Sequence, residues 1–209
     1  DVSAVTNVKF YTSVNPGSYI PTHWHRAVEI IYMQEGSLDV TIESKNFTIY
    51  PEDCILINAN VPHSTKCVSP NKAIVLQIPL DFMEKYIPNI QQLLFVWDHT
   101  TTDPIKRTKI DMLRTTLEQM QIIDDIRPDG FIMRFNSLIF ELLFQLYHNF
   151  SVKVFQSDLS QKKKDLDRLN LVLKYIADNY QRPISLTEIS EIAYLQSGYF
   201  CRFFKKRMG

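Results

Sequence analysis

The sequence predicts an α+β protein with a double-sheet β-barrel at the N-terminus, then a helical hairpin, then a small all-α unit. Three observations support this fold class. Short runs of β-branched and aromatic residues, separated by turn residues, fill positions 1–80. Apolar residues then recur at three- and four-residue steps between positions 105 and 150. A further helical pattern begins at Leu169 and continues to the end of the sequence.

The first 80 residues are expected to form a barrel because of their composition and their turns. Turn residues such as Asn15-Pro16-Gly17 and Glu35-Gly36-Ser37 punctuate this region. Many short strands at this spacing are typical of a barrel or a double-sheet sandwich. The predicted strands are Val8–Tyr11, Glu29–Met33, Leu38–Glu43, Phe47–Tyr50, Cys54–Asn58 and Ala73–Ile78.

Residues 81–155 are expected to form a helical region that packs on the barrel. Two helices, 105–125 and 129–150, are separated by the breaker Arg127-Pro128-Asp129-Gly130. The second helix is apolar over most of its circumference, so it must be buried on more than one side. We therefore expect a homodimer formed through these two helices. The alternative is that both helices only cover their own barrel.

The remainder of the chain is expected to hold a linker, residues 156–168, and a helix-turn-helix unit, residues 169–209. Arg182-Pro183 ends the first helix of this unit, and Ser185 or Thr187 can cap the second. On a helical wheel, the last helix divides into two faces. Tyr199, Phe200, Phe203 and Phe204 lie on one side, whereas Gly198, Cys201, Arg202, Lys205 and Lys206 lie on the other.

The charge distribution fits a nucleic-acid-binding surface at this end of the chain. The net charge of zero argues by itself against a nucleic-acid-binding protein, but it hides an asymmetry. Residues 161–209 carry 10 Lys/Arg and 5 Asp/Glu, whereas residues 1–160 carry 13 and 18. The excess positive charge therefore lies on the part expected to contact phosphates.

The C-terminal pattern closely resembles the first helix-turn-helix of AraC/XylS-type bacterial transcription regulators. The resemblance covers roughly forty residues and fixes residue types at about a dozen positions. It rests on Tyr175-Ile176, Ile184-Ser185-Leu186, Glu188-Ile189, Leu195, Tyr199-Phe200, Arg202, Phe204-Lys205-Lys206 and Gly209. The sequence departs from the family at Ser190, where a small Ala is usual, and at Gln196, where a capping Ser is usual. Ser197 is expected to take over that cap one residue later.

The resemblance implies promoter DNA as a partner, with Gly198, Cys201, Arg202, Lys205 and Lys206 as the DNA-binding residues. Arg202 would contact guanine directly, and the two lysines would contact phosphates. RNA polymerase is a further implied partner. Since such DNA-binding domains carry two helix-turn-helix units, a chain with only the first is expected to keep sensing and dimerisation but to bind DNA poorly.

A second motif lies in the predicted barrel, where the spacing of Gly17, His23, His25, Glu29 and Gly36 matches the first cupin motif in full. The match to the second cupin motif is weaker. Pro51-Glu52-Asp53, Asn58 and Asn60 depart from that motif, whereas Pro62-His63 agrees with it. The resemblance implies a cupin-like jelly roll. Residues of equal parity on a strand share a face, so His23, His25 and Glu29 are expected to point inward together.

Three interpretations of this set stay open. His23, His25, Glu29 and His63 are the ligand types of a divalent metal site. With Trp24 and Tyr32 as aromatic walls, the same residues suit an effector pocket for a small molecule, with a sugar among the candidates. The third interpretation is a set of inert core histidines. We favour the effector pocket and expect no cofactor, with a divalent metal as the alternative.

These features predict a ligand-responsive transcription regulator and not an enzyme. The alternative function is a metal-dependent cupin enzyme, such as a dioxygenase or isomerase, with a helical appendage. An enzyme has no need for the C-terminal cationic helix, which therefore favours the regulator. Cys54, Cys67 and Cys201 are too few for a disulfide framework or a zinc finger. No membrane-length apolar run or signal peptide is visible, so we expect a cytoplasmic protein without membrane contact.

Overall fold

A computed structural model describes residues 7–43, 45–154 and 156–208. The chain divides into two compact units, residues 1–153 and 154–209. The elements of the first unit are β1 (Lys9–Asn15), β2 (Ser18–His23), β3 (Ala27–Glu35), β4 (Leu38–Ile42), β5 (Lys45–Ile49), β6 (Cys54–Ile57), β7 (His63–Cys67), β8 (Asn71–Pro79), α2 (Leu80–Met83), η1 (Ile90–Gln92), β9 (Leu93–Phe95), α3 (Pro104–Ile126), α4 (Phe131–Gln145), η2 (Leu146–Phe150) and β10 (Ser151–Lys153). Those of the second are α5 (Gln156–Asn179), α6 (Leu186–Ile192) and α7 (Ser197–Met208).

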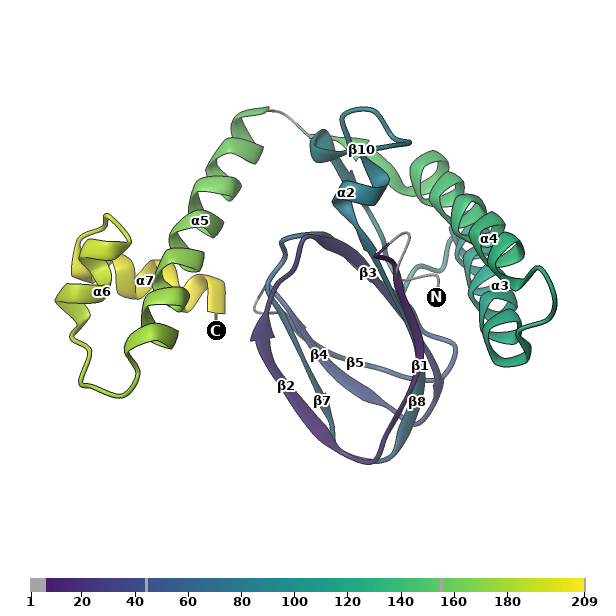
Figure 1. Cartoon of the computed structure of the whole chain (residues 1–209), viewed down its shortest axis with the longest axis horizontal. Coiled ribbons are helices and arrows are strands. Elements are labelled where there is room, and N and C mark those ends of the chain that lie inside the picture. Colours follow the sequence, from purple (N-terminus) through teal and green to yellow (C-terminus); the bar gives the residue numbers. More distant parts are fainter. Residues whose placement is uncertain (1–6, 44, 155, 209) are drawn as a thin grey trace. The chain divides into compact units, whose positions relative to one another are not determined.

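The first unit contains two four-stranded antiparallel sheets that face each other, as Figure 1 shows. One sheet has the order β1-β8-β3-β6 and the other the order β2-β7-β4-β5. The predicted double-sheet architecture of the N-terminal region is therefore present. The strands β2 and β7 were not among the predicted ones. Pro21 interrupts the sequence of β2, which tolerates this residue because it is an edge strand.

Alternation along β3 sends its side chains into two separate cores. Ile31 and Met33 pack between the sheets, in an inner core with residues of β4, β5 and β6. Ile30 and Tyr32 point the other way, into an outer core shared with α3 and α4. Because the strand is apolar on both faces, it is buried on both, and seven of its nine residues are buried.

The helical hairpin α3–α4 covers the outer face of the first sheet (Figure 1). Asp103 caps α3 by accepting hydrogen bonds from the backbone N–H groups of Ile105 and Lys106, and Pro104 occupies the first turn. The helix ends at Arg127, which adopts a left-handed conformation, φ 46°. The two helices and the break between them were predicted at these positions. A short pair, β9–β10, was not predicted, since each strand has only three residues.

The second unit contains the three predicted helices, α5, α6 and α7. The residues expected to form a linker, 156–168, are instead part of α5, which begins at Gln156. Their Gln, Lys and Leu residues have good helix propensity, and this outweighs the serines that suggested coil. Ser185, rather than Thr187, caps α6 through a capping box with Glu188.

Candidate functional site

Three histidines and one glutamate meet between the two sheets of the barrel. His23 ends β2, His25 lies in the connection to β3, Glu29 is on β3 and His63 begins β7. The three residues do not share one strand, so equal parity along a strand is not what brings His23, His25 and Glu29 together. They converge because β2 and β7 change register between Ile20 and His23, and this bulge turns His23 towards His63.

The three rings form a tight cluster. The ring centroids of His23 and His63 are 4.3 Å apart, those of His25 and His63 5.1 Å, and those of His23 and His25 5.9 Å. One ring nitrogen from each histidine lies within 4.8 Å of the others. Among the described residues, this is a group that can hold a metal ion.

Backbone carbonyl groups fix the orientation of all three rings. In each histidine, Nδ1 lies within hydrogen-bond distance of a carbonyl oxygen two residues away: 3.0 Å for His23 and Pro21, 3.1 Å for His25 and Ala27, and 2.8 Å for His63 and Val61. A carbonyl oxygen only accepts, so each Nδ1 carries the hydrogen. In the neutral rings this leaves the lone pair on Nε2, the arrangement found in metal-ligating histidines.

Glu29 adds a buried negative charge beside the rings. Its Oε2 lies 2.8 Å from Nε2 of His25 and accepts a 2.7 Å hydrogen bond from Nε2 of Gln77. Burial by itself would raise the pKa of Glu29, but the hydrogen bonds from His25 and Gln77 outweigh it and hold the pKa below its ordinary value. Burial lowers the pKa of His63. The cluster therefore combines a carboxylate with a neutral imidazole at neutral pH.

A divalent metal ion fits this donor set. The carboxylate of Glu29, like the carbonyl oxygen of Ala27, only accepts hydrogen bonds. Both contacts of His25 are therefore satisfied when each ring nitrogen carries a proton, or when a metal ion replaces the proton on Nε2. Nε2 of His63 is buried, has no hydrogen-bond partner among the described residues, and lies 3.8 Å from Oε2 of Glu29. Imidazole nitrogens with one carboxylate are typical ligands of zinc, iron, manganese or nickel.

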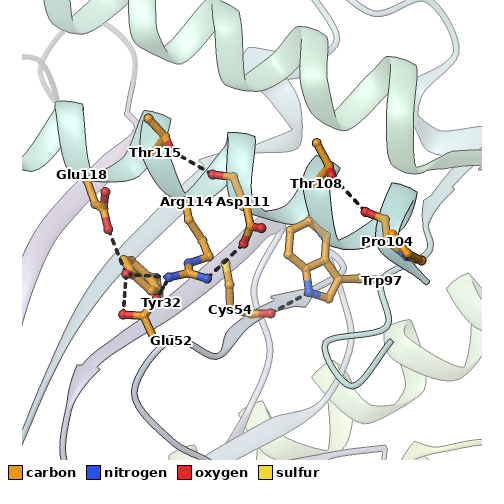
Figure 2. A network of polar contacts seen from close by, with 10 residues as sticks. All are labelled: Tyr32, Glu52, Cys54, Trp97, Pro104, Thr108, Asp111, Arg114, Thr115 and Glu118. Atoms are coloured by element: carbon orange, nitrogen blue, oxygen red, sulfur yellow. Dashed lines mark hydrogen bonds and ion pairs between the residues drawn. The ribbon is translucent and has the colours of Figure 1, made fainter. Parts of the chain in front are cut away.

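Two further residues were expected in this pocket. Trp24 is partly buried, between the two histidines in sequence. Tyr32 does not belong to the group, because residues 29 and 32 lie on opposite faces of β3. Its ring packs in the outer core, where its hydroxyl donates to Oε1 of Glu118 at 2.9 Å and accepts from Nη2 of Arg114 at 3.3 Å (Figure 2). Tyr32 therefore attaches the barrel to α3.

Gln77 and Tyr11 were missed by the sequence analysis. Gln77 pairs with Glu29 across β8 and β3, and Lys9 pairs with Gln77 across β1 and β8. By alternation, Tyr11 shares the Glu29 face, and burial together with the charge of Glu29 raises the pKa of its hydroxyl. No local motif marks either residue; only the strand register brings them to the histidines.

The second candidate site is the outward face of α7. Gly198, Cys201, Arg202, Lys205 and Lys206 are all exposed, as predicted, and Phe200 and Phe203 are buried on the opposite side. A Cβ atom at Gly198 would meet no heavy atom within 4 Å, so this position leaves room for close approach. Tyr199, placed on the apolar side by the helical wheel, is 52% exposed and lies at the boundary between the faces.

The helices α5 and α6 are joined by a polar triad. Arg182 donates to Oε1 of Glu188, and both residues also contact the hydroxyl of Tyr175. The hydrogen bond from Arg182 and then that from Tyr175 lower the pKa of Glu188 to about 2. Tyr175 and Glu188, which both belong to the resemblance, thus hold α5, the turn and α6 together through Arg182.

Ser190, one departure from the regulator pattern, contacts Ser197, the residue that follows the other departure, Gln196. Ser190 is buried, and its Oγ lies 2.9 Å from the carbonyl oxygen of Thr187 and 2.9 Å from Oγ of Ser197. Phe200 donates its backbone N–H to the carbonyl oxygen of Gln196, so α7 begins directly after Gln196. The expectation that Ser197 caps α7 is therefore wrong, because its hydroxyl contacts Ser190 from the first turn of the helix.

Comparison with known proteins gives matches to both parts of the chain. Residues 10–79 match the Cupin domain family. The probable transcriptional regulator LumQ of Photobacterium leiognathi is 28% identical over 189 residues, which cover 90% of this chain and 68% of that protein. The uncharacterized HTH-type transcriptional regulator YbfI of Bacillus subtilis strain 168 is 22% identical, covering 90% of this chain and 66% of that protein. The chain thus spans about two thirds of the length of these relatives.

Two solved structures that resemble this chain each cover about a third of it. The DMSP lyase DddQ from Ruegeria pomeroyi DSS-3 is 27% identical with a TM-score of 0.32, over 34% of this chain and 38% of that chain. An RmlC-like cupin from Shewanella frigidimarina NCIMB 400 is 19% identical with a TM-score of 0.33, over 34% of this chain and 66% of that chain.

The helices offer no membrane-spanning segment, since none in the described part of the chain is long and apolar enough to cross a bilayer. The enzyme alternative is not favoured, because the curated relatives are named as transcriptional regulators. The family match and these relatives together support a transcription regulator that contains a cupin domain.

Proposed function

We propose that this chain carries the ligand-sensing barrel and a helix-turn-helix unit of an AraC-type regulator that binds promoter DNA as a dimer. The observation that carries the proposal is the division of α7 into a buried aromatic side and an exposed cationic side. In a helix-turn-helix, such a recognition helix lies in the major groove with its cations near phosphates. The charge excess of residues 161–209 supports this.

The exposed residues of α7 have different roles in this proposal. Arg202 is the candidate for direct base contact, because a guanidinium can donate two parallel hydrogen bonds to guanine. Lys205 and Lys206 neutralise phosphates, which sets affinity rather than sequence preference. Gly198 and Cys201 complete the surface and allow the helix to approach the bases closely.

The DNA-binding proposal is tested with two variants. Arg202→Ala should cost about 1–3 kcal/mol of binding free energy on the cognate site and relax specificity there. Lys206→Ala should weaken all sequences alike and lower the salt slope by about 0.9. Both are measured as affinity profiles on a randomised duplex library. Uniform losses for both variants would exclude the base contact by Arg202.

The histidine cluster is the sensing site in this proposal. Its imidazole Nε2 atoms and the Glu29 carboxylate are mostly hydrogen-bond acceptors. The cluster therefore favours either a ligand that presents hydrogen-bond donors, such as a sugar, or a cation. Gln77 and the Tyr11 hydroxyl are the neighbouring donors. Binding there would shift the population of conformers in which two chains can engage two half-sites.

A divalent metal ion is the second candidate occupant, favoured by the unpartnered Nε2 of His63. His23, His25 and His63 would hold it through Nε2, with Glu29 as the carboxylate. A bound ion would supply a fixed positive charge that can coordinate an effector oxygen. Metal analysis of protein purified after growth in supplemented medium decides between the two occupants; less than stoichiometric metal would exclude the ion.

The outward side of α4 is the proposed dimer surface. Its inward side packs in the outer core, yet Met133, Phe140 and Phe144 remain exposed, as does Tyr147 in the following η2. The hairpin partner α3 exposes Met112 and Ile122 in addition. A monomer rarely exposes so many large apolar side chains on two adjacent helices. A second copy of the hairpin presents the same apolar chemistry and would cover them through a two-fold interface.

A further inference from the structure

Tyr194 adopts a backbone conformation that large side chains avoid. It lies in the turn between α6 and α7 with φ 55°, in the left-handed region that favours Gly or Asn. Two hydrogen bonds of 2.9 Å define this turn, from the Tyr194 N–H to the carbonyl oxygen of Glu191 and from the Leu195 N–H to that of Ser190. The geometry of the turn is therefore fixed, and a tyrosine is an unfavourable residue for it.

Packing does not compensate for this conformation. The residue is 81% exposed, more than any of the other nine tyrosines of the sequence. Burial of its ring therefore contributes little to the stability of the unit. A residue that is strained and still exposed is a candidate for contact with a partner.

The distribution of charge along α7 indicates which partner. The segment from Tyr194 to Tyr199, which includes the start of α7, has no Lys or Arg. The cations Arg202, Lys205 and Lys206 all follow this segment. A recognition helix in a major groove meets a phosphate backbone on both sides. Beside the start of α7, where this segment carries no cation, neutral donors such as hydroxyl groups can make such contacts. The hydroxyl of Ser197 is already paired with Ser190.

We propose that the Tyr194 hydroxyl donates a hydrogen bond to a DNA phosphate beside the start of α7. This contact rests on the proposed function, because it requires the recognition helix to enter the groove. It would position α7 from the side opposite Lys205 and Lys206. A neutral donor releases no counterion, so the contact adds affinity without adding to the salt dependence.

The test uses Tyr194→Asn and Tyr194→Phe in the whole chain, with short random duplex DNA as the probe. Asn suits the left-handed conformation, so Tyr194→Asn should unfold at the same temperature as the wild type or higher. Both variants should bind the duplex about tenfold to a hundredfold more weakly, as expected for a lost hydrogen bond to a charged group. The salt slope should stay at the wild-type value.

Two controls separate this inference from the function on which it rests. Tyr180→Ala removes another exposed tyrosine of the same unit and should leave affinity unchanged. Lys206→Ala should weaken binding and lower the salt slope. If Lys206→Ala behaves so while either Tyr194 variant keeps wild-type affinity, the phosphate contact is wrong and DNA binding stands. Because a single helix-turn-helix is expected to bind weakly, the titration is run at low salt, where phosphate contacts are strongest. A wild type that shows no salt-dependent binding even there overturns both proposals.

Discussion

The Oγ atoms of Ser190 and Ser197 lie 2.9 Å apart, so the hydroxyl on α6 and the hydroxyl on α7 form one hydrogen bond. Ser190 is 2% exposed and also contacts the carbonyl oxygen of Thr187. A buried hydroxyl needs hydrogen-bond partners; the carbonyl oxygen of Thr187 is one and the Ser197 hydroxyl is the other. The departure at Ser190 is therefore paired with the serine that follows the departure at Gln196, and this pair sets α7 against α6.

This pair predicts coupling between two serine substitutions. Ser190→Ala and Ser197→Ala should each lower the free energy of unfolding by about 0.5–1.5 kcal/mol, the usual net value of one hydrogen bond. The double variant should lose less than the sum of the single ones by about 0.5 kcal/mol or more. Urea unfolding of the four proteins measures the cycle, and strict additivity would show that the two hydroxyls act independently.

The triad around Glu188 predicts acid sensitivity of the second unit. The pKa of Glu188 lies at about 2, below its ordinary value of 4.5, because Arg182 and then Tyr175 donate hydrogen bonds to it. The unfolded chain binds the proton more readily, so the stabilisation is complete above the ordinary pKa and is lost as the pH falls towards about 2. Circular dichroism of unfolding across this range should show the loss.

A matched pair of variants isolates this effect. In Glu188→Gln the carboxylate is absent, so the acid-dependent part of the loss should shrink. Glu191→Gln changes an exposed carboxylate on the same helix and serves as the control. If Glu188→Gln follows the wild-type pH profile, another group is responsible.

The exposed side of α4 predicts a dimer that one charge can break. Phe144 is 59% exposed, so Phe144→Asp should be tolerated by the monomer but would bury an unpaired carboxylate in the interface. We expect the dimer dissociation constant to rise about tenfold or more in sedimentation experiments. Val14→Asp, on an exposed barrel residue outside the hairpin, should leave it unchanged. A wild type that remains monomeric at high concentration would exclude this interface.

The histidine cluster predicts ligand-dependent stability that requires His63. A sugar or Zn²⁺ that occupies the cluster at a hundredfold excess over its dissociation constant should stabilise the wild type by about 2.7 kcal/mol. His63→Ala should abolish the thermal shift, whereas His148→Ala, on an exposed histidine of η2, should retain it. A shift that persists in His63→Ala would place the ligand elsewhere.

The sequence by itself determined the features that depend on local periodicity. The cationic and aromatic sides of α7 follow from 100° steps along a helix, and the breaker at residues 127–130 separates α3 from α4 in the same way. Composition also separated the strand-rich region from the helical ones. The spacing of His23, His25 and Glu29 identified the residue types of the site without its geometry.

Only the tertiary structure decided which residues meet. A register shift in β2 turns His23 towards His63, and the β8–β3 ladder brings Gln77 to Glu29. Strand register and bulges depend on pairing between distant segments, which a local pattern does not encode. Alternation along β3 likewise placed Tyr32 against α3 rather than in the pocket. The sequence identified the types of residue at the site, whereas only the folded structure showed which of them lie in contact.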